Sequence, residues 1–264
     1  MKNSLTIYGH PASQPSRTVF WACLLHDLPF TLGDTSGRDP STGGSNPRGQ
    51  IPSIVDDGFA VSEMSAIVCY LADKHAWHEL YPQELKTRTR IQQFLHMQHG
   101  LVRLATFRLM APHVMKPLGI ITPTDGNPLS MAQNETLTTA FASEDPHSDG
   151  GQVVHTIVGF LEEFYFSHAS PFVCNTENVS VADLACYAEI GQFRFANLFD
   201  FKDYPRTERW LDEMSRVPHH DTIHAYDLLL GDIRTNPNTM ERFDAASQAG
   251  FAALRETGLV SLAH

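Results

Sequence analysis

Strand signals in this chain of 264 residues are confined to its first third, and this asymmetry restricts the possible folds more than any other feature. Residues 5–8 are a short run of β-formers that Gly9 and Pro11 stop. Residues 16–26 then repeat apolar side chains with helical spacing, and residues 30–32 read as a second strand. The chain therefore opens with a strand, a helix and a strand.

A hairpin and a helix complete this segment. Residues 33–49 are rich in Gly, Ser and Pro, which predicts a long loop. Residues 53–61 place apolar runs on both sides of an Asp-Asp-Gly turn at 56–58, a strong hairpin signal. A helix is expected over residues 64–74. The order is typical of a small thioredoxin-like α/β layer, which we assign to residues 1–76.

From Pro82 onward we expect helices only. The segments with helical periodicity are 85–115, 153–168, 181–198, 204–217 and 239–259. Residues 117–151 break the pattern as a loop, and Ser180 with Asp183 forms a capping box. The predicted fold class is α+β/α with two domains: the thioredoxin-like βαβ-ββα layer, a linker at 77–86, and an all-helical substrate domain with a C-terminal extension at 87–264.

Composition excludes several classes of protein. No stretch approaches the ~20 apolar residues of a membrane span, and residues 1–10 lack the features of a signal peptide. The net charge of −11 comes without a basic cluster that would bind nucleic acid. The cysteines are far apart, show no zinc spacing, and are expected to be reduced thiols of a cytoplasmic protein: Cys23, Cys69, Cys174 and Cys186. No metal site is expected.

Ser13 is the first candidate for chemistry. It stands where the first strand ends and a helix begins, close to the positive end of the helix dipole. A hydroxyl there either caps the helix or donates a hydrogen bond to an anion, and a thiolate held at such a place has a lowered pKa. No GxSxG motif surrounds Ser13, so a serine-hydrolase role is not expected.

Two further positions have a structural and a functional interpretation. Gln50, Ile51 and Pro52 lead into the hairpin, where a cis Pro52 would let Ile51 pair with an extended peptide ligand, while a trans proline would only mark a strand edge. Glu63 precedes the next helix, where it either complements the helix dipole or binds an ammonium group.

Three motifs in order resemble the cytosolic glutathione transferases of the theta class and the bacterial dichloromethane dehalogenases. Residues 10–17 (HPASQPSR) are similar to the start of these proteins, and residues 46–52 (NPRGQIP) and 62–71 are similar to the rest of their glutathione-binding domain. Residues 179–190 are similar to the helical-domain signature. This combination favours the functional interpretation of Ser13 and of Pro52.

The resemblance implies glutathione as co-substrate, a homodimer and a role in detoxification. Ser13 would donate a hydrogen bond to the glutathione sulfur, and Ile51 before cis Pro52 would pair with the cysteinyl backbone. Glu63 and the N–H of residue 64 would receive the γ-glutamyl end. The further implied contacts are an active-site arginine at Arg103, which is otherwise a solvated helix residue, and Gln14, Arg38 and Arg48 for the glycine carboxylate.

One position departs from the family pattern. The family has Ser directly after the acidic residue, and this chain has Met64 there, with Ser65 one position late and about 100° round the helix. The lost hydrogen bond to a charged group costs about 1.5–3 kcal/mol. We therefore expect weak glutathione binding or a different ligand.

Three functions follow from these features. The leading one is a glutathione transferase, in which the glutathione thiolate attacks a small hydrophobic electrophile. The alternatives are a glutathione-dependent reductase or lyase on the same fold, and a binding protein without turnover. Residues 117–151 and 236–264 are each expected to form either a lid over the substrate or an external brace.

Overall fold

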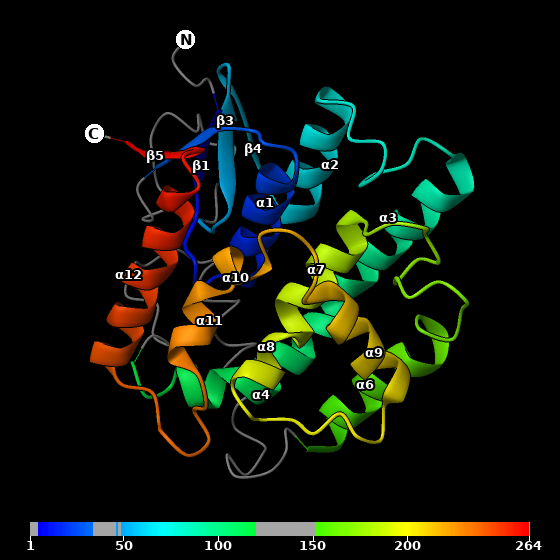
Figure 1. The fold of residues 1–264 in the computed structure, drawn as a ribbon, viewed down its shortest axis with the longest axis vertical. Helices are drawn as coiled ribbons and strands as arrows, with labels where there is room; N and C mark the ends of the chain where they lie inside the picture. The colour runs from blue at the N-terminus through cyan, green and yellow to red at the C-terminus, as the bar shows by residue number, and fades with distance from the viewer. Residues whose placement is uncertain (1–4, 34–45, 47–48, 120–150, 264) are drawn as a thin grey trace.

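The computed structural model describes residues 5–33, 46, 49–119 and 151–263. A mixed sheet with its helices lies at one end of the molecule, and a group of helices fills the other end (Figure 1). Within the described part of the chain, no helix is long and apolar enough to cross a membrane. The predicted two-part architecture is confirmed.

Five strands form the sheet, in the order β4-β3-β1-β2-β5. Four of them were predicted: β1 (Leu5–Tyr8), β2 (Phe30–Leu32), β3 (Ser53–Asp56) and β4 (Phe59–Ser62). β1 lies parallel to β2 and antiparallel to β3, and β3 pairs with β4 through the expected hairpin.

The fifth strand corrects the prediction that strands end at Pro82. β5 (Val260–Leu262) pairs in parallel with β2, with Phe30 opposite Val260 and Leu32 opposite Leu262. The C-terminal tail thus returns to the N-terminal sheet, and residues 87–264 are not helical throughout. The sequence did not predict β5 because three residues are too few to show the alternation of a strand. The strand forms because the edge of β2 is open for pairing.

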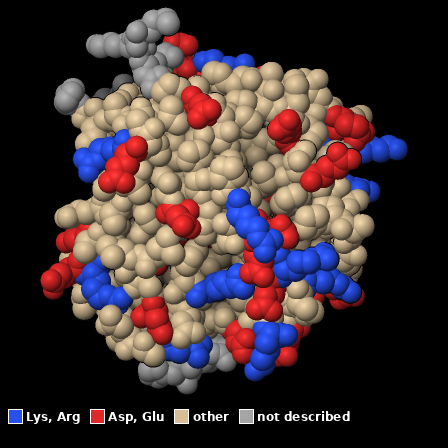
Figure 2. All heavy atoms as spheres, in the orientation of Figure 1, with Lys and Arg blue, Asp and Glu red and all other residues tan. Residues whose placement is uncertain are grey.

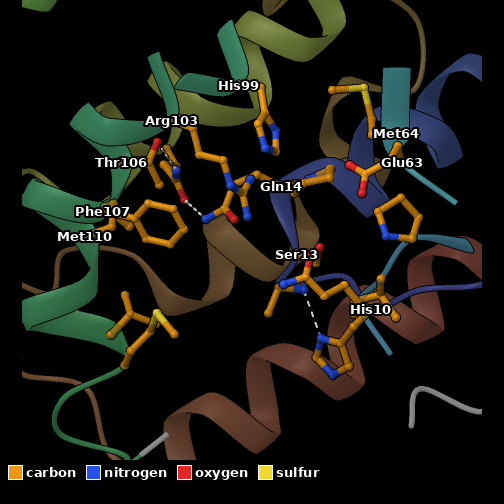
Figure 3. A pocket seen from close by; sticks show the side chains of 18 of the residues that line it. His10, Ser13, Gln14, Glu63, Met64, His99, Arg103, Thr106, Phe107 and Met110 are labelled. Atoms are coloured by element: carbon orange, nitrogen blue, oxygen red, sulfur yellow. Dashed lines mark hydrogen bonds between the residues drawn. The ribbon is translucent and has the colours of Figure 1, made fainter. Parts of the chain in front are cut away.

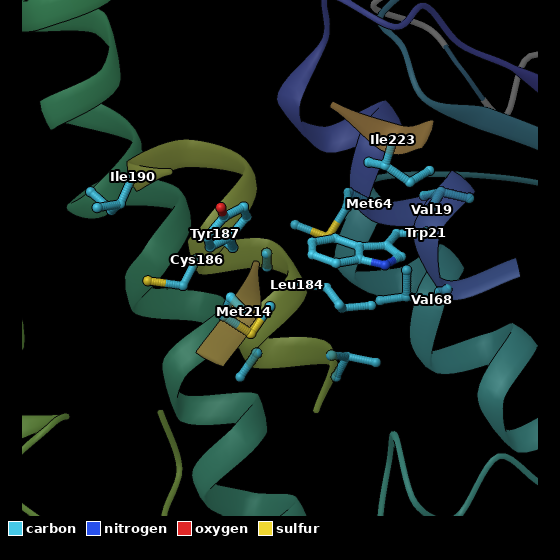
Figure 4. Close-up of a cluster of buried hydrophobic side chains, with 14 of the residues drawn as sticks. Val19, Trp21, Met64, Val68, Leu184, Cys186, Tyr187, Ile190, Met214 and Ile223 are labelled. Atoms are coloured by element: carbon cyan, nitrogen blue, oxygen red, sulfur yellow. The ribbon is translucent and has the colours of Figure 1, made fainter. Parts of the chain in front are cut away.

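Helix α1 (Gln14–Leu25) joins the two domains. Every side chain from Ser16 to Leu24 is buried, because α1 packs on α2 (Met64–Lys74) on one side and on α7 (Val181–Ile190) on the other. Figure 4 shows the shared apolar cluster, in which Trp21 and Met64 lie between these helices. The apolar side chains predicted to share one face of α1 are buried, and so are the side chains on its other faces.

The helical domain contains shorter helices than the periodicity predicted. They are α3 (Leu85–Gly100), α4 (Val102–Val114), α6 (Gly151–Phe164), α7, α8 (Gln192–Phe195), α9 (Pro205–Met214), α10 (His220–Ile223), α11 (Ala225–Leu230) and α12 (Met240–Glu256). The expected helix over residues 85–115 is divided at Leu101. The one over residues 181–198 is divided at Gly191, where a Cβ atom would lie 2.8 Å from both the ring and the carbonyl oxygen of Tyr187.

The capping box at the start of α7 is confirmed. The buried Asp183 carboxylate accepts hydrogen bonds from the Ser180 N–H at 2.9 Å and the Ser180 hydroxyl at 2.7 Å. It also accepts from the N–H of Val173 at 2.8 Å and from the indole N–H of Trp210 at 3.1 Å. The box therefore fixes neighbouring segments as well as the helix start.

Helix α12 packs against α10, α11 and the loop before α1. In Figure 1 it runs along one side of the molecule toward the sheet, where β5 continues it. A Cβ atom on Gly250 would lie 2.5 Å from Cβ of Pro11, so only glycine permits this close approach. The predicted lid segment at residues 117–151 lies almost entirely outside the described residues.

Both acidic and basic side chains lie on the face of the molecule drawn in Figure 2, and many of them meet in its lower right part. Among the ion pairs of the helical domain are Arg194 with Asp212 at 2.8 Å and Arg216 with Glu213 at 2.9 Å. Such exposed pairs contribute little to stability, about 0–1 kcal/mol each.

Candidate active site

A pocket of about 490 Å³ lies between the two domains. The loop before α1, the segment before β3 and the start of α2 form one side, which we call the thiol half. Helices α3, α4, α11 and α12 form the other side, which we call the electrophile half. A site shared by two domains is a common arrangement for small-molecule binding.

The pocket brings together all the predicted site residues that the structure describes. They are Ser13, Gln14, Gln50, Ile51, Pro52, Glu63, Met64, Ser65 and Arg103. These residues come from both domains, and Figure 3 shows Glu63 and Arg103 on opposite sides of Ser13. Arg38 and Arg48 lie outside the described residues.

Ser13 is the N-cap residue of α1 and lines the pocket at the same time. Its Oγ accepts a hydrogen bond from the N–H of Ser16 at 3.4 Å, and its carbonyl accepts from the N–H of Arg17 at 3.0 Å. The hydroxyl uses an acceptor lone pair for the cap, so its proton remains able to donate to a ligand. The two interpretations of Ser13 are therefore compatible.

The peptide bond between Ile51 and Pro52 is cis. The preceding loop is held by Asn46, whose amide donates to the Gln50 carbonyl at 2.8 Å and accepts from the Gln50 N–H at 3.1 Å. Both Ile51 and Pro52 line the thiol half of the pocket. This is the arrangement that the functional interpretation of Pro52 requires.

Glu63 is the N-cap residue of α2, with a positive φ of 75°. A non-glycine residue in this region is unusual and is often found at functional sites. The side chain of Met64 belongs to the buried cluster of Figure 4 and is only 8% exposed. Position 64 therefore presents mainly its backbone to a ligand, beside the N–H groups that begin α2.

Gln14 is committed to the domain interface. Its amide donates to the side-chain oxygen of Gln192 at 2.9 Å, and the Gln192 amide donates to the Thr106 hydroxyl at 3.3 Å (Figure 3). The second N–H of this amide remains able to donate, so the contact with the glycine carboxylate stays a prediction. The relay ties the start of α1 to α4.

Arg103 extends from α4 toward the centre of the pocket, above Gln14 and Ser13 in Figure 3. Its Nη1 lies 2.8 Å from Oε1 of Glu189, which is 1% exposed. Its Cζ lies 5.0 Å from the ring centroid of Phe107, within cation–π range. The interpretation as a solvated helix arginine is wrong, because Arg103 is paired, stacked and part of the pocket wall.

His10 lines the pocket; it begins the motif at residues 10–17, but the sequence analysis gave it no role of its own. Its Nδ1 lies 3.0 Å from the N–H of Ala12, and its ring stacks on Phe243 and meets Phe251 edge-on. Burial and the charge of Arg17 lower the pKa of His10. The ring therefore presents a neutral imidazole and fixes α12 to the pocket wall.

The apolar wall of the electrophile half was also not predicted. It consists of Phe107, Met110, Val114, Met115, Tyr226 and Phe243. No motif marks these residues, although Phe243 belongs to the apolar side of the predicted tail helix.

Among the described lining residues there is no cysteine, and burial raises the pKa of Cys186 and Cys23 well above that of a free thiol. A cysteine nucleophile is thus not part of this pocket.

Comparison with known families identifies the N-terminal part. The model for "Glutathione S-transferase, N-terminal domain" matches residues 7–80. This range contains the second half of β1, the strands β2 to β4, the helices α1 and α2, and the thiol half of the pocket.

The relatives extend the similarity to most of the chain. It is 26% identical to glutathione S-transferase T1 of Arabidopsis thaliana, over 83% of this chain and 87% of the relative. It is 25% identical to human glutathione S-transferase theta-1, over 86% and 89%. Glutathione S-transferase T2 of Arabidopsis thaliana is 27% identical over 83% of this chain, but the match spans only 36% of that longer relative.

Solved structures share the fold. The apo form of human glutathione S-transferase T1-1 superposes with a TM-score of 0.65 at 23% identity, covering 95% of this chain and 100% of that one. Human glutathione transferase theta-2, in complex with glutathione and an unknown ligand, gives a TM-score of 0.64 at 20% identity, covering 96% and 99%. The chain therefore has the glutathione transferase fold, its residues 7–80 match the N-terminal domain of that family, and it is similar to theta-class members over most of its length.

Proposed function

We propose that this chain is a glutathione transferase that activates the glutathione thiol with Ser13. The observation that carries the proposal is the position of Ser13, at the start of α1 and on the wall of a pocket shared by both domains. The Ser13 hydroxyl donates a hydrogen bond to the glutathione sulfur, and the dipole of α1 adds a favourable field. Both stabilise the thiolate over the thiol.

The thiol half supplies the remaining contacts with glutathione. The backbone of Ile51 pairs with the cysteinyl residue, in the way an edge strand binds a peptide. Glu63 receives the γ-glutamyl ammonium group, and the N–H groups of Met64 and Ser65 at the start of α2 receive its carboxylate. Gln50 lies beside this peptide track.

The electrophile half positions the second substrate against the sulfur. Phe107, Met110 and Phe243 offer apolar and aromatic surface for a small hydrophobic electrophile. Arg103 extends from α4 toward the centre of the pocket, where the N–H groups that Glu189 leaves unused donate hydrogen bonds to the leaving group. The thiolate sulfur forms a bond to carbon while the leaving group departs with the electron pair of the broken bond.

Retention on immobilised glutathione, followed by turnover with a panel of electrophiles, tests the proposal. A transferase is retained and conjugates at least one electrophile, whereas a reductase instead consumes glutathione to form its disulfide. A binding protein is retained without turnover, and loss of retention would refute the glutathione site.

We further propose a cytoplasmic homodimer. Size-exclusion chromatography with light scattering tests its oligomeric state.

A further inference from the structure

Arg103 is the one lysine or arginine among the described residues that line the pocket. The positive charge of Arg103 is compensated within the protein, because its Nη1 lies 2.8 Å from Oε1 of Glu189. The Glu189 side chain is 1% exposed and the Arg103 side chain is 22% exposed. Glu189 therefore stands behind Arg103 as seen from the pocket and pairs with it out of contact with solvent.

The Glu189 carboxylate depends on Arg103 for charge compensation. Within the described part of the chain, Oε2 has no hydrogen-bond partner, and the only other contact of Oε1 is the Gln98 amide at 3.5 Å. Gln192 and the Thr106 hydroxyl donate to the backbone carbonyl of Glu189, not to its carboxylate. Because charges attract more strongly away from water, the two groups act as a neutral pair.

This pairing determines the charge of the electrophile half. The wall around Arg103 is formed mainly by Phe107, Met110 and Phe243, and His99 of α3 is its other titratable side chain. The only acidic residue among the described lining residues is Glu63, on the other side of Ser13 (Figure 3). The electrophile half therefore offers no net positive charge to a second substrate.

We propose that Glu189 is a specificity-determining residue that makes the pocket select uncharged electrophiles over anionic ones. It touches neither substrate and acts through Arg103, so it is a positioning residue. The inference rests on the proposed transferase function. In the reaction itself, the glutathione sulfur bonds to the electrophilic carbon, a halide leaves with the bonding pair, and the thiol proton has already passed to solvent.

The variant Glu189→Gln tests the proposal, because glutamine keeps an oxygen for Arg103 and removes only the charge. The measured quantity is the ratio of kcat/KM for 4-(chloromethyl)benzoate to kcat/KM for benzyl chloride. We expect this ratio to rise about tenfold in the variant at low ionic strength, and to rise less in high salt. A ratio that stays unchanged overturns the proposal.

Gln98→Leu is the matched control, since it removes the other contact with the same carboxylate oxygen but no charge. Its ratio is expected to equal that of the unaltered protein. An equal rise in both variants would mean that loosening of Arg103, not charge, sets the selectivity, and would overturn the proposal.

Binding of conjugates provides a measurement that does not need turnover. Titration calorimetry compares S-benzylglutathione with S-(4-carboxybenzyl)glutathione. The unaltered protein is expected to bind the uncharged conjugate more tightly, and Arg103→Gln, which leaves Glu189 unpaired, is expected to increase this preference. If each protein binds the two conjugates with equal affinity, only this inference is overturned. If the unaltered protein binds neither conjugate, the proposed function is overturned as well. Arg103→Gln also replaces Glu189→Gln as the test variant if the latter does not fold.

Discussion

Nδ1 of His10 accepts a hydrogen bond from the N–H of Ala12, at 3.0 Å. An acceptor nitrogen carries no proton, so the neutral ring has its proton on Nε2. Burial and the Arg17 charge lower the pKa of His10 below its usual 6.5, which keeps the ring neutral at pH 7. We expect nitrogen NMR of the imidazole to show the Nε2–H tautomer at pH 7 and titration below pH 6.5.

The matched variant is His10→Phe, which preserves the ring contacts with Phe243 and Phe251 but leaves the Ala12 N–H without its acceptor. A loss of about 1 kcal/mol in the free energy of unfolding is expected from a partly buried donor without a partner. An Nδ1–H signal at pH 7, or an unaltered unfolding free energy in His10→Phe, would contradict this assignment.

Ser13→Ala is expected to lower kcat/KM roughly tenfold to a thousandfold and to raise the pKa of bound glutathione. The lost cap costs a further ~1 kcal/mol of stability. Thiolate absorbance as a function of pH measures the bound thiol. Ser16→Ala is the control: it removes a hydroxyl from the same turn that is buried and has no hydrogen-bond partner among the described residues. Normal turnover in Ser13→Ala would remove this hydroxyl from the mechanism.

Met64→Ser is expected to tighten glutathione binding, because the short serine side chain, unlike the buried thioether, can turn its hydroxyl toward the pocket and donate to the γ-glutamyl carboxylate. The same change removes a side chain from the core, so the free energy of unfolding should fall by about 2–4 kcal/mol. Calorimetry and urea denaturation measure the two effects separately. Met64→Leu keeps a side chain of similar volume, so it should change neither the glutathione affinity nor the free energy of unfolding greatly. Equal affinity in Met64→Ser would mean that position 64 binds through its backbone alone.

Stability should fall in mildly acidic solution because of His224. Burial lowers the pKa of His224 to about 4, while its Nδ1 lies 2.9 Å from Asp227. The unfolded chain titrates near 6.5, so it binds the proton first as the pH falls. Above pH 6.5 His224 is neutral in both states and does not affect the free energy of unfolding. Between pH 6.5 and about 4 that free energy falls by on the order of 3 kcal/mol. Urea denaturation at several pH values measures it.

His224→Gln provides the comparison, since glutamine does not titrate. The slope of unfolding free energy against pH should be shallower in this variant over the same interval. His10, His26 and His75 also have pKa values lowered by burial, so a smaller slope of the same sign remains. Parallel curves for the two proteins would exclude His224 as the source.

Two truncations separate the roles of the tail. Removal of residues 259–264 deletes β5 but leaves α12, so we expect a lower melting temperature with kinetics preserved. Removal of residues 235–264 also deletes Phe243 from the pocket wall and Phe251 from its contact with His10. Turnover and electrophile preference should then change together. Unchanged kinetics after the longer truncation would reduce α12 to an external brace.

Local sequence patterns predicted the strands and helices of the N-terminal part almost residue for residue. They work there because each element is bounded by its own turn residues, such as Gly9 or the turn at Asp57. They predicted the helix α1 but not its burial on all sides, which comes from contacts with both domains. They also failed at Leu101 and Gly191, where tertiary contacts divide helices whose periodicity continues.

The site shows the same division. Ser13, Pro52 and Glu63 lie in short motifs at element boundaries, where backbone geometry and chemistry restrict the residue type. Tyr226 and Phe243 reach the pocket only because α11 and α12 fold back over it, and their spacing resembles that of any apolar helix face. Glu189 had no signal, since its partner Arg103 is 86 residues away in the chain.

The pairing of β2 with β5 has a consequence for the order of folding. Thr31 lies opposite Ser261, so the edge of the sheet is completed by a contact between opposite ends of the described chain. During synthesis, β2 keeps an exposed edge until residues 260–262 have emerged, long after its other neighbours are in place. Contacts of such sequence separation form slowly, and an open strand edge invites association with other chains. The helical domain is thus made while the sheet that precedes it is still incomplete.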